Sequence, residues 1–192
     1  MSKFLIKLVI VSTLVSLTAC SGATKALNGT TKTVDGAFGY KLGEVFNPNP
    51  IINTSESSVN PCYNFTPEKP FENIQKYCIK TTPISNRIYS IEGNSVFNSY
   101  TECSHAEKLI AELIQNKYGK GESVFNIGKD GVIVSAMTIT KDDKYIYVMS
   151  YHDEGLSGLH HLTVSYNDEG LKKLAQKEST ENLLRGVDDS QF

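Results

Sequence analysis

The stretch GVIVSAMTITKDDKYIYVMSY, at positions 131–151, decides the fold class. Its two ends, residues 131–140 and 144–151, are apolar and rich in β-branched and aromatic side chains, and Asp142-Asp143 lies between them. Two such runs joined by two turn-forming residues predict an antiparallel β-hairpin. A third run, residues 159–166, follows a short glycine-containing loop and predicts the third strand of a meander.

More strands are expected upstream of this meander. Residues 74–82 and 87–92 have the composition of strands, and Pro83-Ile84-Ser85-Asn86 between them has that of a turn, so they predict a second hairpin. Residues 38–46 alternate between large and small or polar side chains, which suits a short strand. Residues 47–61 contain prolines among Asn and Ser and predict a long irregular loop.

The strongest helical pattern covers residues 104–118. Its apolar side chains recur at three- and four-residue steps, which predicts one amphipathic face. They are Ala106, Leu109, Ile110, Leu113, Ile114 and Tyr118. Ser104 and Glu107 fit a capping box, and Gly119 follows the last periodic residue. We expect the side chains that form the buried face of this helix to be Leu109, Ile110, Leu113 and Ile114.

These elements predict an α+β fold. It consists of one antiparallel sheet, made of the hairpin and the three-stranded meander and covered by the amphipathic helix. Residues 123–127 are expected to add a short strand, and Asn167 to cap a short C-terminal helix. A chain of 192 residues suits a single domain, which we place at residues 38–180, followed by a polar tail at 181–192.

Composition and motifs exclude several classes of function. The formal net charge is −2, so a nucleic-acid-binding protein that works by bulk positive charge is not expected. The sequence contains no Gly-x-Ser-x-Gly, no His-Glu-x-x-His and no phosphate-binding glycine loop. We therefore expect a non-enzymatic protein without a cofactor.

The N-terminus has the organisation of a secretory signal peptide. Lys3 and Lys7 provide a positive start, and the uncharged apolar run Leu8–Leu17 follows. This run is too short to span a bilayer, which takes about 20 residues. Residues 1–19 are therefore expected to be a signal peptide rather than a transmembrane helix.

The end of this segment, Leu17-Thr18-Ala19-Cys20, resembles the bacterial lipobox. The resemblance implies that Cys20 carries diacylglycerol on its sulfur, that the chain is cleaved before Cys20, and that the new terminus is acylated, for example with palmitate. Such multiple acyl chains give stable membrane anchoring. The residue after Cys20 is Ser21 and not Asp. In this the sequence resembles the lipoproteins that are sorted to the outer membrane, where the protein would face the periplasm. The alternative is a plain secreted protein in which Cys20 lies near the cleavage site by chance.

The expected mature protein is tethered and mildly acidic. Removing residues 1–19 lowers Lys+Arg from 19 to 17 against 21 acidic residues, a side-chain net charge of −4. Such a body gains no attraction to anionic lipid, so the acyl chains alone would hold it to the membrane. Residues 20–37, mostly small and polar after the lipidated cysteine, are expected to form a flexible tether.

Three cysteines remain when Cys20 is assigned to lipid. In an oxidising compartment a pair of Cys62, Cys78 and Cys103 should form a disulfide, and we favour Cys62–Cys78. Cys103 lies next to the expected helix N-terminus, where the helix dipole lowers a thiol pKa. Cys103 is either a reactive or intermolecular thiol, a buried free cysteine, or the partner of Cys78 with Cys62 left free.

Histidines flank the loop between the last two strands of the meander. If these strands pair, His152 lies near His160 or His161, and only one of the two can share its face because neighbours on a strand point to opposite sides. Two imidazoles near a carboxylate are ligands that suit zinc or copper. His152 and His160 are therefore candidates for a metal site, and solvated histidines at a loop edge are the alternative.

One strand carries a face of large amphipathic side chains. Tyr145, Tyr147, Met149 and Tyr151 alternate with apolar residues along 144–151. Tyrosine and methionine suit interfaces, so this face is a candidate protein-binding surface. The alternative is a fully covered central strand, with the helix on one face and loop 47–61 on the other.

The segments Asn64-Phe65-Thr66-Pro67, Thr82-Pro83 and Lys117-Tyr118-Gly119 give the body a layout similar to that of uncharacterised bacterial lipoproteins and periplasmic proteins, which implies no activity. We expect an envelope lipoprotein that binds another envelope protein or supports envelope assembly. The alternatives are an inhibitor or immunity lipoprotein that blocks a hydrolase with loop 47–61, and a metal-binding envelope protein.

Overall fold

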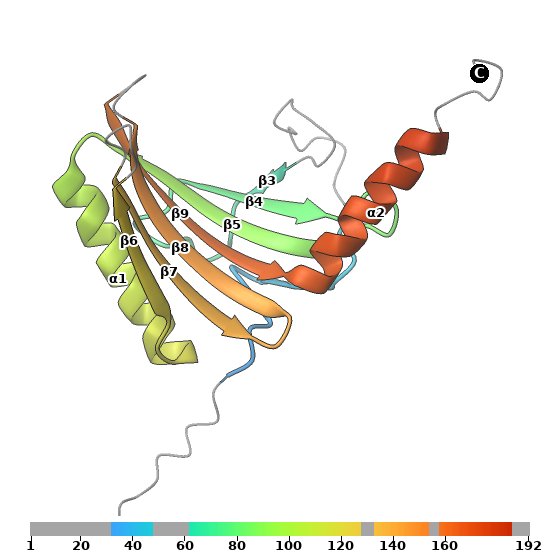
Figure 1. Cartoon of the computed structure of the whole chain (residues 1–192), viewed down its shortest axis with the longest axis horizontal. Coiled ribbons are helices and arrows are strands. Elements are labelled where there is room, and N and C mark those ends of the chain that lie inside the picture. Colours follow the sequence, from blue (N-terminus) through green and yellow to red (C-terminus); the bar gives the residue numbers. More distant parts are fainter. Residues whose placement is uncertain (1–31, 48–61, 128–132, 154–157, 186–192) are drawn as a thin grey trace, which may run out of the picture. The chain divides into compact units, whose positions relative to one another are not determined.

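A computed structural model describes residues 32–47, 62–127, 133–153 and 158–185. The expected signal peptide, Cys20, Ser21 and most of the tether and of loop 47–61 lie outside these residues. The described chain is α+β, with a seven-stranded antiparallel sheet, a two-stranded hairpin and two helices (Figure 1). Among the described helices, none combines the length and the apolar character needed to cross a bilayer.

The strands of the large sheet follow the order β3-β4-β5-β9-β8-β7-β6. Their bounds are β3 Cys62–Phe65, β4 Lys76–Thr81, β5 Ile88–Phe97, β6 Glu122–Ile127, β7 Ile133–Lys141, β8 Lys144–Asp153 and β9 Leu159–Asp168. The small hairpin consists of β1 Gly36–Ala37 and β2 Tyr40–Lys41, and the helices are α1 Tyr100–Tyr118 and α2 Glu169–Arg185.

Residues 131–151 were predicted to form an antiparallel hairpin, and β7 and β8 pair in this way. Lys141 lies opposite Lys144, so the turn between β7 and β8 has only two residues, and Asp142 adopts φ 54° there. Such a left-handed conformation is what a tight hairpin turn requires, and Asp tolerates it well. The two expected hairpin systems belong to one sheet, because β5 pairs with β9 along its length and places Ile91 opposite Tyr166.

Alternation along the strands gives the sheet two unlike faces. The inner face carries side chains that are completely or almost completely buried, among them Ile79, Ile91, Ile146, Val148, Leu162 and Val164. α1 packs on this face over β8, β9 and β5. The outer face carries the alternate residues, and it is more polar and more exposed.

The helix α1 is longer at its start than the sequence predicted. Ser99 is the N-cap and accepts a hydrogen bond from the Glu102 backbone, so the expected capping box at Ser104 and Glu107 was wrong. The helix ends as expected, with Gly119 as C-cap at φ 97°. Its buried residues are Cys103, Ala106, Ile110, Ile114 and Tyr118.

The expected buried face of this helix was only half right. Ile110 and Ile114 are buried, but Leu109 and Leu113 are 38% and 53% exposed. The apolar residues form a stripe wider than the contact with the sheet, so helix periodicity alone did not decide which edge of the stripe faces the sheet.

The N-terminal segment also covers the inner face. The expected strand over 38–46 is instead a hairpin whose turn residues, Phe38 and Gly39, both have positive φ, followed by a segment that pairs Val45 with Arg87. The Phe38 ring lies 4.9 Å from the ring of Tyr77. Gly36 cannot be replaced in this hairpin without strain, because an added Cβ would collide with the Tyr40 carbonyl oxygen.

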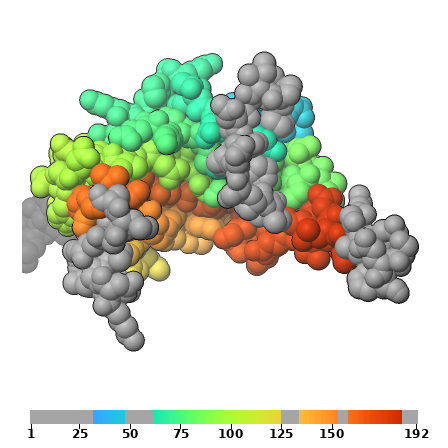
Figure 2. Space-filling view, turned by 90° about the horizontal axis from the view of Figure 1, so that it is seen from above, coloured from blue at the N-terminus to red at the C-terminus, as the bar shows by residue number. Residues whose placement is uncertain are grey.

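The second helix, α2, packs against the ends of β5 and β9 (Figures 1 and 2). Asp168 rather than Asn167 caps it, since the Leu171 N–H donates to Asp168 Oδ1. Asn167 instead lies inside β9, one residue before its end, with a buried side chain that accepts a hydrogen bond from Ser90 Oγ. α2 continues to Arg185, beyond residue 180, where the sequence analysis placed the end of the domain.

Candidate functional site

A disulfide joins the edge of the sheet to the neighbouring strand. Cys62 of β3 and Cys78 of β4 are bridged, with their Cα atoms 5.5 Å apart. They lie two pairs apart in the register and so share one face of the sheet, because Cys62 is opposite Lys80 and Cys78 is opposite Asn64. The pairing favoured from the sequence is therefore the one in the structure.

The third of these cysteines, Cys103, is a buried free thiol. It lies in the first turn of α1, faces the sheet, and its Sγ contacts the His161 carbonyl oxygen at 3.7 Å. Burial, together with the nearby Glu107 carboxylate, raises the pKa of Cys103 to about 11. Of the alternatives that the sequence left open, the structure has the buried free cysteine. Loss of solvent and a nearby negative charge outweigh the effect of the helix dipole on its pKa.

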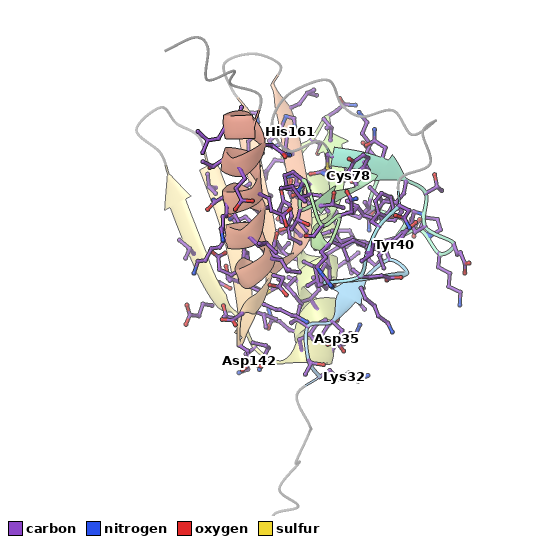
Figure 3. All side chains as sticks on the ribbon, turned by 90° about the vertical axis from the view of Figure 1, so that its right-hand side faces the viewer. Lys32, Asp35, Tyr40, Cys78, Asp142 and His161 are labelled. Carbon is purple, nitrogen blue, oxygen red and sulfur yellow. A yellow bond between two sulfur atoms is a disulfide. The ribbon has the colours of Figure 1, made fainter. Side chains whose placement is uncertain are left out.

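The histidine pair forms as the strand pairing required. His152 of β8 lies directly opposite His160 of β9, and their rings stack with centroids 4.1 Å apart. His161 points to the other face and stacks on Tyr151 at 4.6 Å. This end of the sheet is the one away from Asp142 and the β7–β8 turn (Figure 3). Burial, with the nearby His152 and His161, lowers the pKa of His160.

A metal site at this pair remains a prediction. Within the described part of the chain, the three-ligand cluster with suitable spacing is Cys62, Cys78 and Glu92, and both of its cysteines are in the disulfide. The gap beside His152 and His160 has a volume of about 10 Å³, which is no larger than a water needs.

Near this gap lies a polar contact between α1 and the sheet that was not predicted from the sequence. The Glu107 carboxylate points from α1 toward the sheet and accepts hydrogen bonds from Ser135 Oγ at 2.6 Å and Ser150 Oγ at 2.7 Å. The sequence signal for this contact was the position of Glu107 on the buried stripe of the helix. The other members of that stripe are Cys103, Ile110 and Ile114. The contact ties α1 to β7 and β8.

The candidate binding surface on β8 is present as one face. Tyr145, Tyr147, Met149 and Tyr151 all point to the outer face, and each is partly exposed. The register places Met149 beside Ala136 of β7, which in turn lies beside Val124 of β6. Val124, at 61%, is strongly exposed.

The same face becomes polar toward β5 and α2. Tyr145 receives a hydrogen bond of 3.5 Å from Lys172 of α2, which places this tyrosine beside the helix. Lys80 and Glu92 form an ion pair of 2.6 Å on β4 and β5. The apolar part of the outer face therefore lies over β6, β7 and the half of β8 that is distant from α2.

An apolar pocket on the inner face was not foreseen from the sequence. It has a volume of about 140 Å³ and lies between α1, the turn of the β1–β2 hairpin and residues 71–74. Its walls combine Phe38, Ile114 and Tyr166, which come from three parts of the chain. No local sequence signal predicts such a pocket, because it exists only where these elements meet.

Comparison with protein-family models, with curated proteins and with solved structures gave no match for this chain.

Proposed function

We propose that this chain is a lipid-anchored protein of the bacterial envelope that binds another envelope protein without catalysing a reaction. In this proposal, a signal peptide at residues 1–19 is removed and the new N-terminal Cys20 carries the lipid anchor. The anchored protein lies at the outer membrane and faces the periplasm. The lipobox-like Leu17-Thr18-Ala19-Cys20 supports the anchor. The disulfide between Cys62 and Cys78 is consistent with an oxidising compartment.

The observation that carries the binding role is the apolar part of the outer face, which we call the docking patch. Its members are Val124, Val134, Ala136, Tyr147, Met149 and Tyr151. They lie on three adjacent strands, β6 to β8, and include the edge strand β6. Contiguous exposed apolar surface with aromatic side chains is typical of protein interfaces.

The partner that fits is a protein segment with an apolar surface. The ion pair Lys80–Glu92 lies on β4 and β5, outside the patch, so the patch offers aromatic and aliphatic side chains rather than charge. The exposed edge of β6 additionally offers backbone groups to an extended segment. A small soluble ligand is not expected there, because a flat sheet face does not enclose one.

Site-specific photocrosslinking tests the binding role. A photoreactive residue at Val124 should give a discrete crosslinked product in membranes, and the same residue at Thr140 should not. Thr140 is the matched control, because it is exposed on the same face of β7 but near the α2 end. Val124→Lys should then abolish a crosslink made from Tyr147. Equal crosslinking from Val124 and Thr140 would remove the docking patch from the proposal.

Lipidation is tested separately. Cys20→Ser should leave the chain uncleaved or release it from the membrane, and it should not incorporate labelled palmitate. A Cys20→Ser variant that still incorporates the label at processed size would contradict the anchor.

A further inference from the structure

The pocket under α1 has the size of a single aromatic ring. Its volume of about 140 Å³ is close to that of an engineered apolar cavity of about 150 Å³ in another protein, which binds benzene. It lies next to α1, with the inner-face residue Val164 of β9 at its base. It is open to the surface beside Leu113, which is 53% exposed.

The walls of this pocket are fixed without a ligand. The Phe71 N–H donates to the Tyr77 hydroxyl at 2.7 Å, and that hydroxyl donates back to the Phe71 carbonyl. The wall residue Ile74 packs against Gly93, where an added Cβ would come within 2.9 Å of Ile74 Cγ2. A pocket held open by such contacts requires little reorganisation to bind.

Two buried tyrosine rings belong to the pocket lining. Tyr118 and Tyr166 are only 2% and 8% exposed, and their rings lie 6.3 Å apart. Burial, together with the nearby Tyr118, raises the pKa of Tyr166, so its hydroxyl stays a donor. Aromatic rings attract one another edge to face, so a lining that contains these two rings suits an aromatic ligand.

The mouth of the pocket carries a positive charge. Lys117 lines it, is exposed, and holds its Nζ 4.7 Å from the centre of the Tyr118 ring. The ion pairs within the described ranges involve Lys80 and Lys177, so no described carboxylate pairs with Lys117. An anion at the mouth would therefore find a cation that is not yet neutralised.

We propose that this pocket binds a small aromatic carboxylate. The ring lies between Phe38 and Ile114, and the carboxylate lies at the mouth beside Lys117. The size of the ligand ring follows from the volume of the pocket, and the negative charge of the ligand follows from Lys117, which no described carboxylate pairs with. This site lies on the face opposite the docking patch, so it is independent of the proposed protein-binding role.

The probe for this site is 4-fluorophenylacetate, followed by ¹⁹F NMR on the full chain in lipid nanodiscs, with protein-free nanodiscs as blank. We expect saturable binding with a Kd on the order of 0.1–1 mM, as suits a ligand of this size. Leu113→Trp fills the mouth and should weaken binding at least tenfold. Leu109→Trp is the matched control, because it adds the same ring to an exposed position of α1 outside the lining, and binding should be unchanged.

The charge is tested by a second pair of measurements. Lys117→Gln should weaken binding of 4-fluorophenylacetate about fivefold and leave the neutral 4-fluorophenylacetamide unchanged. The proposal is overturned if binding does not saturate, if Leu113→Trp and Leu109→Trp have equal effects, or if Lys117→Gln affects the acid and the amide alike.

Discussion

Replacing Ile114 by alanine should destabilise this protein far more than the same change at its neighbour, Leu113. Ile114 is 5% exposed, and its side chain lies against the inner face of the sheet. Removing three buried carbons costs about 2.4 kcal/mol, from about 0.8 kcal/mol for each. The void left behind adds to this, although part of it merges with the pocket already present, so we expect about 2–4 kcal/mol in all.

Leu113 loses the same number of carbons at a half-exposed position. Because it is 53% exposed, we expect Leu113→Ala to cost only about 1 kcal/mol. The assay is urea unfolding of both variants and of the unchanged chain, each produced without residues 1–20 so that no lipid is attached. With an m-value of about 2 kcal/mol/M, the two midpoints should differ by about 0.5–1.5 M.

The comparison tests which edge of the α1 stripe faces the sheet. Both variants place alanine at adjacent positions of one helix, so differences in helix propensity between them are small. Equal losses of stability, or a larger loss from Leu113→Ala, would refute the packing of α1 described above.

Three further outcomes are expected. Non-reducing peptide mapping should recover Cys62 joined to Cys78, and replacing both by alanine should cost about 3 kcal/mol, whereas recovery of Cys78 as a free thiol would contradict the bridge. Iodoacetamide at pH 8 should label Cys103 at least about 100-fold more slowly in the native protein than in urea, because burial raises its pKa to about 11; rapid native labelling would show that the thiol is accessible. The side chain of Glu178 is buried, and burial alone would raise the pKa of its carboxyl group. Hydrogen bonds from Ser85, Ile84 and Thr82 lower the pKa by more than burial raises it, so the pKa is below its ordinary value of 4.5. Because the pKa of Glu178 is lower in the folded chain than in the unfolded chain, its charged form stabilises the fold above about pH 4.5, and this stabilisation is lost as the pH falls through the folded pKa. Glu178→Gln should therefore lower the free energy of unfolding by about 1–3 kcal/mol at pH 7, and the difference from the unchanged chain should close below about pH 4. A difference that is constant with pH would exclude this role.

Local patterns were sufficient for most of the secondary structure. Residues 131–151 predicted β7, β8 and the two-residue turn between them, because side-chain alternation and turn chemistry are both properties of neighbouring residues. The end of α1 at Tyr118 followed from Gly119 in the same way. The start of α1 and the cap of α2 did not follow from residue type, because all four candidate residues are suitable caps. They are Ser99, Ser104, Asn167 and Asp168.

The candidate site depended on pairing between distant strands. That His152 would meet one of two adjacent histidines followed from the meander, but only the register of β8 and β9 selected His160. The contact of Glu107 with Ser135 and Ser150 joins residues up to 43 positions apart. The local signal was that Glu107 lies on the apolar stripe of α1, which does not reveal its partners on the sheet.

Short-range patterns in the sequence were enough to predict the α+β class, the strand pairs joined by short turns, and the amphipathic character of α1. Each of these depends on residues within a few positions of one another, and the physical preferences act at that range. The tertiary structure alone decided that β5 pairs with β9 and that Ile110 and Ile114, rather than Leu109 and Leu113, are buried. It alone also formed the pocket beside Lys117, because packing between distant elements minimises exposed apolar area over the whole domain rather than within one segment.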